Sequence, residues 1–224
     1  MKNKRTLMAG AAIVGAVALT GLSVTAEQQS DETPEMGVFL TSVGTGDGAN
    51  LGGLAGADAH CQALADAVGS GDRTWRAYLS TQGADAVNAR DRIGSGPWAN
   101  VNGLVMATSI ESLHYDNSNF NWEHMLDENG DQFVSRIDGD PETSAHDVLT
   151  GSKIDGTAYP EGDDRTCNNW TSNDAGSAML GHADRYSFVT PGSSWNAAHG
   201  SRGCSQDNLV ATGGAGLFYC FAAE

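Results

Sequence analysis

Four cysteines constrain the fold of this chain more than any other feature of its sequence: Cys61, Cys167, Cys204 and Cys220. An even number of cysteines in an exported protein indicates disulfide bonds, here two of them. Metal ligation is the alternative, but the chain has neither a Cys-x-x-Cys motif nor the Cys and His spacing of a zinc site. Four cysteines can pair in three ways, and their positions alone do not select one.

The N-terminus predicts export. Lys2, Lys4 and Arg5 precede an apolar run over residues 7–24, which closes on a small-x-small site at 24–26. This order of segments is typical of a secretory signal peptide, here residues 1–26, followed by a polar linker over 27–36. An uncleaved anchor is the alternative, because the run is close to the shortest length that spans a bilayer. We expect a secreted or periplasmic protein with no stable membrane span after cleavage.

The charge of the chain excludes several partners. It has 12 basic and 28 acidic residues, a net charge of −16. Three of the basic residues lie in the leader, which leaves 9 against 28, or −19, for the exported part. Such a surface repels nucleic acid, heparin-like polyanions and anionic membranes. A surface with this charge suits a cation as partner. Solubility or adaptation to salt explains the negative charge equally well.

Residues 37–224 are long enough for one domain with a sizeable core. A helix is predicted where apolar residues recur every three or four positions from Leu54 to Val68, with Gly69 ending it. Strands are predicted over 36–43, 74–80, 132–137 and 215–221. In the second of these, Arg76 and Tyr78 fall on the face predicted to be wet. Residues 113–159 are polar, acidic and weakly patterned, which is typical of functional loops.

Several short motifs follow one another in a distinctive order. Residues 56–61 read Gly-Ala-Asp-Ala-His-Cys and residues 74–80 read Thr-Trp-Arg-Ala-Tyr-Leu-Ser. Later motifs are Gly-Ser at 151–152, Cys-Asn-Asn-Trp at 167–170, Cys204, and Leu-Phe-Tyr-Cys at 217–220. In this order, over roughly 38–224, the chain resembles endostatin-like domains, which have a C-type-lectin-like fold. The chain is also similar to bacterial secreted lectin-like domains.

This resemblance implies an α+β fold with a mixed, mostly antiparallel sheet, two helices and long irregular loops. It also implies nested disulfides, Cys61–Cys220 and Cys167–Cys204. Two family properties are not expected here, because the chain lacks the basic patch that binds heparin and the N-terminal histidines that bind zinc. The calcium and sugar site of C-type lectins is not expected either, since Ala197 stands where their Trp-Asn-Asp triplet has its aspartate.

One acidic segment is a candidate calcium site. Asp127, Asn129 and Asp131 alternate like the first three ligands of an EF-hand loop, and Asp138 stands further along where a bidentate glutamate would be. Oxygen atoms are the ligands that calcium prefers. The match is partial because Gly130 is at the fourth position of the loop and not at the sixth. A solvated acidic turn is the alternative.

Aromatic residues in the polar stretch are the candidate ligand-binding residues. Trp122, with Tyr115 and the amide of Asn119 near it in sequence, could stack on a sugar ring and bind its hydroxyls. A small local core that also includes Phe120 is the alternative. The six histidines show no ligand spacing, although His182 and His199 could approach each other near Cys204.

The sequence contains no catalytic motif, so we expect a binding module and not an enzyme. The predicted function is glycan binding, assisted by calcium if the acidic segment holds it. The alternative is a protein-binding module of the cell envelope or of adhesion, with an extracellular or envelope protein as partner. Choice of ligand from the fold alone would be analogy.

Overall fold

The computed structural model describes residues 33–116, 119–135, 144–185 and 194–224. The predicted signal peptide, most of the predicted linker and Asp138 lie outside these residues. Residues 33–224 form one compact unit.

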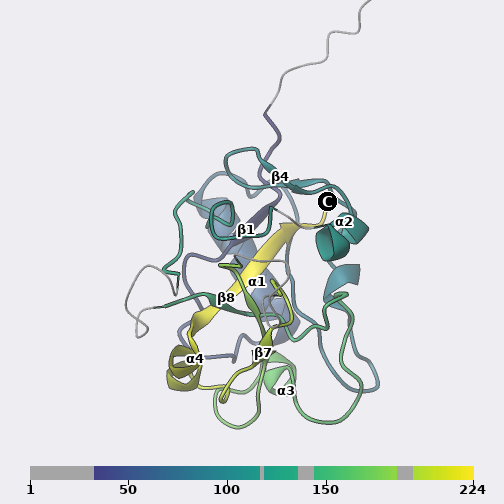
Figure 1. The fold of residues 1–224 in the computed structure, drawn as a ribbon, viewed down its shortest axis with the longest axis vertical. Helices are drawn as coiled ribbons and strands as arrows, with labels where there is room; N and C mark the ends of the chain where they lie inside the picture. The colour runs from purple at the N-terminus through teal and green to yellow at the C-terminus, as the bar shows by residue number, and fades with distance from the viewer. Residues whose placement is uncertain (1–32, 117–118, 136–143, 186–193) are drawn as a thin grey trace, which may run out of the picture. The chain divides into compact units, whose positions relative to one another are not determined.

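The last strand organises the main sheet (Figure 1). β8 (Gly214–Ala222) pairs antiparallel with β1 (Val38–Leu40) and β2 (Trp75–Ala77), and parallel with β5 (Asp147–Leu149). β6 (Met179–His182) and β7 (His199–Gly200) continue the sheet beyond β5, both antiparallel. A separate pair joins β3 (Trp98–Ala99) to β4 (Val105–Ala107). The chain is therefore α+β, with a mixed sheet in which most of the described pairings are antiparallel.

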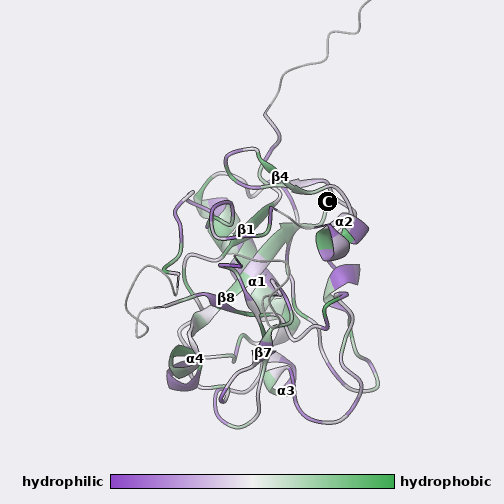
Figure 2. Ribbon diagram, in the orientation of Figure 1, coloured by the Kyte–Doolittle hydropathy of each residue, from purple (hydrophilic) through white to green (hydrophobic). Residues whose placement is uncertain are grey.

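Both faces of β8 are buried, which explains its almost continuous apolar sequence. Phe218 and Cys220 face one core cluster together with α1, whereas Leu217, Tyr219 and Phe221 face a second cluster. The side chains of β1 divide between the same two clusters. Figure 2 shows the apolar colouring concentrated on β8 and around it, with polar residues in the surrounding loops.

One predicted helix is confirmed. α1 covers Gly53–Ala67 and buries Ala57, Asp58, Cys61 and Ala65. Gly69 follows it with φ 79°, a left-handed conformation that glycine adopts without strain. The buried carboxylate of Asp58 accepts hydrogen bonds from Arg76 and from Arg92, and these ion pairs attach α1 to β2 and to the short 3₁₀ turn η1 (Ala89–Asp91).

The expectation of two helices is wrong, because the described residues contain four. The additional ones are short: α2 (Ile110–Tyr115), α3 (Cys167–Trp170) and α4 (Gln206–Thr212). Helices of one or two turns give little periodic signal, and these depend on side-chain caps from Ser109, Thr166 and Ser205. The four residues of α3 have φ between 47° and 67°, so α3 is a left-handed turn.

Three further expectations differ from the structure. Residues 132–135, the described part of the strand predicted over 132–137, form no strand; the carbonyl of Val134 accepts from Ala145 N, and the Ser135 hydroxyl donates to Asp184. Tyr78 is fully buried and not on a wet face, since its hydroxyl bonds to His114 and Asn196 in the second core cluster. The first predicted strand pairs as β1 over three residues only.

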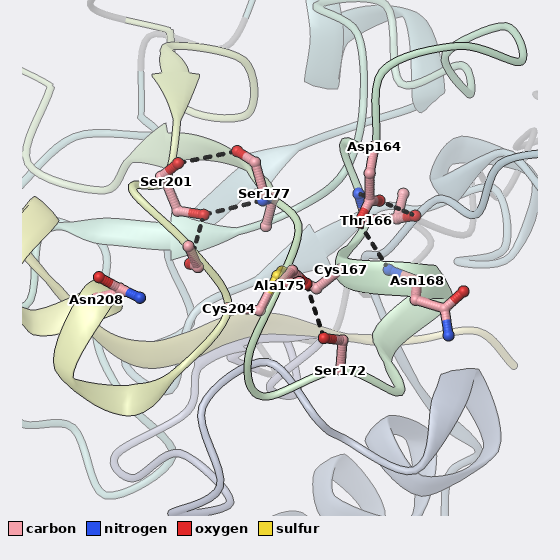
Figure 3. Close-up of a disulfide and its surroundings, with 12 residues drawn as sticks. Asp164, Thr166, Cys167, Asn168, Ser172, Ala175, Ser177, Ser201, Cys204 and Asn208 are labelled. Atoms are coloured by element: carbon pink, nitrogen blue, oxygen red, sulfur yellow. Dashed lines mark hydrogen bonds between the residues drawn. A yellow bond between two sulfur atoms is a disulfide. The ribbon is translucent and has the colours of Figure 1, made fainter.

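Both disulfides implied by the resemblance are confirmed. Cys61 of α1 bonds to Cys220 of β8, and Cys167 bonds to Cys204. The second bridge holds the left-handed turn α3 against the segment that precedes α4, where Ser201 accepts a bond from Ala178 N and one from Ser177 (Figure 3). Within the described residues, no helix is long and apolar enough to cross a membrane.

Candidate metal centre

Three adjacent strands bring histidine and aspartate side chains to one end of the sheet. Asp147 of β5 pairs in register with His182 of β6, and His199 of β7 pairs with Leu180, two residues before His182. Residues paired across strands, or two apart along one strand, lie on the same face of a sheet. His146 precedes β5, and its carbonyl accepts a hydrogen bond from Ala183 N.

One carboxylate oxygen lies at the centre of this group. Asp147 Oδ1 is 3.3 Å from His182 Nε2, 3.4 Å from His199 Nε2 and 3.5 Å from His146 Nε2. The two atoms His182 Nε2 and His199 Nε2 are 2.9 Å apart. Ligand atoms of His146, Asp147 and His182 all lie within 4.8 Å of one another.

These separations match the edges of a coordination tetrahedron. With metal–nitrogen bonds of about 2.0–2.1 Å, as for zinc, two ligands of a tetrahedral site lie roughly 3.3 Å apart. The three distances to Asp147 Oδ1 agree with that value. The nitrogens of His182 and His199, which are 2.9 Å apart, would need to separate by about 0.4 Å to reach it.

Asp147 has a carboxylate in an unusual position. Its side chain is fully buried, and neither of its oxygens has a hydrogen-bond partner in the part of the chain that the structure describes. Burial on its own would raise the pKa of Asp147, but the imidazoles of His182, His199 and His146 outweigh it and lower the pKa to about 2. A buried carboxylate is costly unless it is paired or coordinates a metal.

Hydrogen bonds on the outer side of two rings direct their Nε2 atoms inward. His146 Nδ1 lies 3.0 Å from Asp184 Oδ1, and Ser135 donates to the other oxygen of Asp184. His199 Nδ1 lies 3.2 Å from the carbonyl of Gly200. Carboxylates and backbone carbonyls that accept from Nδ1–H leave Nε2 unprotonated, which is the form that binds metals.

With their Nε2 atoms unprotonated, three imidazoles and a carboxylate oxygen at these distances would repel one another unless a cation lay between them. The group therefore has the composition and the spacing of a metal site with three histidines and one aspartate. The strands that provide these ligands are part of the main sheet, so the backbone holds their Cα positions by ladder hydrogen bonds.

The predicted calcium residues lie elsewhere, in a turn that begins at Asp127, which forms a bridge with Leu40 of β1. Asp127 Oδ1 accepts hydrogen bonds from the backbone N–H groups of Asn129 and Asp131, at 2.8 and 2.9 Å. Glu128, between them, is buried and accepts from both the backbone and the hydroxyl of Ser42. Asp138 is outside the described residues, so calcium binding by these residues stays a prediction.

The predicted sugar-binding residues differ in their exposure and hydrogen bonds. Tyr115 is exposed at the end of α2, whereas Asn119 donates its amide to the carbonyl of Val105. Trp122 is half-buried, and its carbonyl accepts from Gln132. Phe120 is in the second core cluster, stacked on Phe221 and tilted against Trp195. Phe120 is thus part of the large second cluster and not of a small core local to the polar stretch.

Sequence reasoning considered the approach of His182 to His199 but not the roles of His146, Asp147 and Asp184. The signals that could have found them are a His-Asp pair at the start of a strand and a second His-x-Asp at 182–184. A scan against protein-family models and a search of curated proteins found no match for this chain.

Proposed function

We propose that this protein is an exported domain that binds a divalent transition metal through His146, Asp147, His182 and His199. The observation that carries the proposal is the convergence of three imidazole Nε2 atoms, each 3.3–3.5 Å from a buried carboxylate oxygen that lacks a hydrogen bond. A cation at this point would partner the carboxylate and separate the imidazoles.

The ligand set selects a class of metal. Imidazole ligands suit zinc, copper, iron and nickel, whereas calcium and magnesium take oxygen ligands. Zinc(II) or cobalt(II) fits the near-tetrahedral spacing of the four atoms. The net charge of the chain, −16, favours the approach of cations from solution.

A direct titration tests this proposal. The mature protein, stripped of metal with a chelator, is titrated with zinc against a chromophoric competitor, and bound metal is measured by elemental analysis. We expect one equivalent of zinc per chain. His182→Gln removes one ligand and is expected to abolish stoichiometric binding. His60→Gln is the matched control and should bind as the parent does, since His60 lies on α1 and its Nε2 bonds to the carbonyl of Val43.

Two results would contradict the proposal. The first is a folded, stripped protein that takes up no zinc, cobalt or other first-row metal at micromolar concentration. The second is equal loss of binding in the His60 and His182 variants, which would mean that the metal binds without these strands.

The domain type is part of the proposal. We infer an exported C-type-lectin-like domain, because the first strand of the domain pairs with the last and two nested disulfides have the pairing implied by the sequence resemblance. Disulfides are typical of secreted and periplasmic proteins.

A second candidate function is glycan binding, and one hollow in the surface favours it. A cavity of about 340 Å³ lies between the end of β1, residues 127–134 and the start of β8. Its lining combines polar Ser42, Asp127 and Gln132 with apolar Phe133 and Val134, as sites for small ligands do. A protein segment is the alternative occupant.

A glycan array with the oxidised protein, read in calcium and again with chelator, tests this second function. We expect binding that Val134→Asp abolishes, because Val134 is exposed at the hollow. Loss of binding with chelator would indicate that calcium assists at residues 127–131. A folded protein that binds no glycan would overturn glycan binding and leave the protein-binding alternative.

A further inference from the structure

We infer that the metal centre keeps a coordination position for a small exogenous anion, and that the hydroxyl of Ser144 is the hydrogen-bond partner of that anion. The inference rests on the proposed metal binding and adds to it. It distinguishes a centre that takes a small anion as a fifth ligand, and so exchanges ligands, from a closed four-coordinate centre that only stabilises the fold.

A hollow of about 190 Å³ opens beside two of the proposed ligands. It is lined by Ser144, His146 and His199 on one side and by residues 210–213, at the end of α4, on the other. One molecule of liquid water occupies about 30 Å³, so the hollow has room for a small anion and several waters. His199 is the most exposed of the four ligands, with 42% of its side chain accessible, and gives the hollow its contact with solvent.

Gly213, which has no side chain, leaves the space between the hollow and the proposed ligands open. A Cβ atom on Gly213 would lie 3.0 Å from His146 Nε2 and 3.1 Å from Asp147 Oδ2. Such a side chain would fill the space next to both coordinating groups. Gly213 also has φ 127°, a conformation that other residues rarely adopt. The backbone conformation and the open space beside the ligands therefore both require glycine at this position.

Ser144 provides a second, independent observation. Its residue is only 4% exposed, and its Oγ has no hydrogen-bond partner within the described residues. A buried hydroxyl without a partner is destabilising, so such groups in native proteins bond to water or to a ligand. Ser144 and His146 both line the hollow, which places the hydroxyl beside a proposed ligand.

The charge of the centre selects the class of ligand. Three neutral imidazoles and one carboxylate leave a divalent metal with a net charge of +1. A monoanion neutralises that charge, and a serine hydroxyl can donate a hydrogen bond to it. Small monoanions such as azide therefore serve as probes of the position, whatever the natural ligand is.

The experiment uses the mature, oxidised protein loaded with cobalt(II), whose visible absorption reports the number and type of ligands. Azide titration is expected to change the cobalt spectrum saturably. Ser144→Ala is expected to bind cobalt as the parent does and to weaken azide binding at least about tenfold, the effect of losing one hydrogen bond to a charged group. Ser70→Ala, which is not among the residues lining the hollow, is the control and should behave as the parent.

A variant that fills the hollow makes the test independent of Ser144. Ala211 lies exposed on α4 at the rim, and Ala211→Trp is expected to keep cobalt and lose the response to azide. A cobalt spectrum that azide leaves unchanged would overturn the open position while leaving metal binding intact. Azide affinity equal in the parent and Ser144→Ala would overturn the role of the hydroxyl. Failure to bind cobalt would overturn this inference together with the proposed function.

Discussion

The orientation of single side chains decides whether the histidines of this protein can act as ligands. An imidazole has two nitrogens, and only an unprotonated one can bind a metal. Asp184 holds the Nδ1 side of His146 at 3.0 Å, so Nε2 faces Asp147. Asp184 is thus a positioning residue, and it binds no metal itself in this arrangement.

Asp184→Asn tests that role. An amide can still accept a hydrogen bond from Nδ1–H, but it lacks the charge that raises the basicity of the ring. We expect zinc affinity to fall about 10- to 100-fold, the usual effect of changing such a partner. The competition titration measures the affinity, and the melting temperature of the metal-free protein controls for misfolding.

Asp163→Asn is the matched control for this variant, because the Asp163 side chain is 94% exposed. Zinc affinity unchanged in Asp184→Asn, with the metal-free protein equally stable in both variants, would show that Asp184 has no part in the centre.

At the same scale, the sequence predicted residue types better than residue roles. Tryptophan has a large ring that favours burial, and the tryptophans at 75, 98, 170 and 195 are all buried in the core. The surroundings of the acidic residues are harder to predict. The carboxylate of Asp127 accepts hydrogen bonds from backbone N–H groups of its own turn, whereas the carboxylate of Asp147 has no such bond among the described residues. The identity of a side chain does not reveal which of these environments surrounds it.

At the scale of elements, α1 was predictable because its apolar residues follow the helical period within one continuous segment. Three of the four proposed metal ligands come from strands of two to four residues, too short to show alternation, and His146 directly precedes one of these strands. His182 and His199 are 17 residues apart in sequence and meet only because β6 and β7 pair. Pairing of distant strands is a property of the whole sheet, and no local pattern near either histidine encodes it.

The residues in loops also bind partners that are distant in sequence. The 3₁₀ turn η1 and the residue after it place Arg90, Asp91 and Arg92 next to one another in sequence. Arg92 nevertheless pairs with Asp58 on α1, and Asp91 accepts from the amide of Asn88. Neighbours in sequence were the natural partners to expect, but the buried carboxylate of a distant helix attracts the guanidinium more strongly, because burial strengthens charge interactions.

At the scale of the whole molecule, the disulfides connect the ends of the domain. Cys61–Cys220 spans 159 residues and Cys167–Cys204 spans 37. The pairing came from the resemblance, since position alone allowed three arrangements. In the structure, the long bridge joins the first helix to the central strand, and the short one closes the region that holds β6 and β7.

The two bridges are expected to differ in their contribution to stability. In the chain-entropy description, a cross-link stabilises by restricting the unfolded chain, and the effect grows with the logarithm of the loop closed. That relation gives about 5 kcal/mol for the long bridge and about 4 kcal/mol for the short one. Chemical denaturation of Cys61→Ala/Cys220→Ala and of Cys167→Ala/Cys204→Ala, each against the parent, measures both values.

Metal binding separates the two variants further. His182 and His199 lie on strands inside the loop that Cys167–Cys204 closes, whereas the long bridge attaches to α1 and β8. We therefore expect zinc to bind more weakly to the Cys167→Ala/Cys204→Ala variant than to the Cys61→Ala/Cys220→Ala variant, although the latter is the less stable. The same competition titration measures both affinities at a temperature where both variants are folded. The opposite order of affinities would mean that the sheet holds the ligands without help from the short bridge.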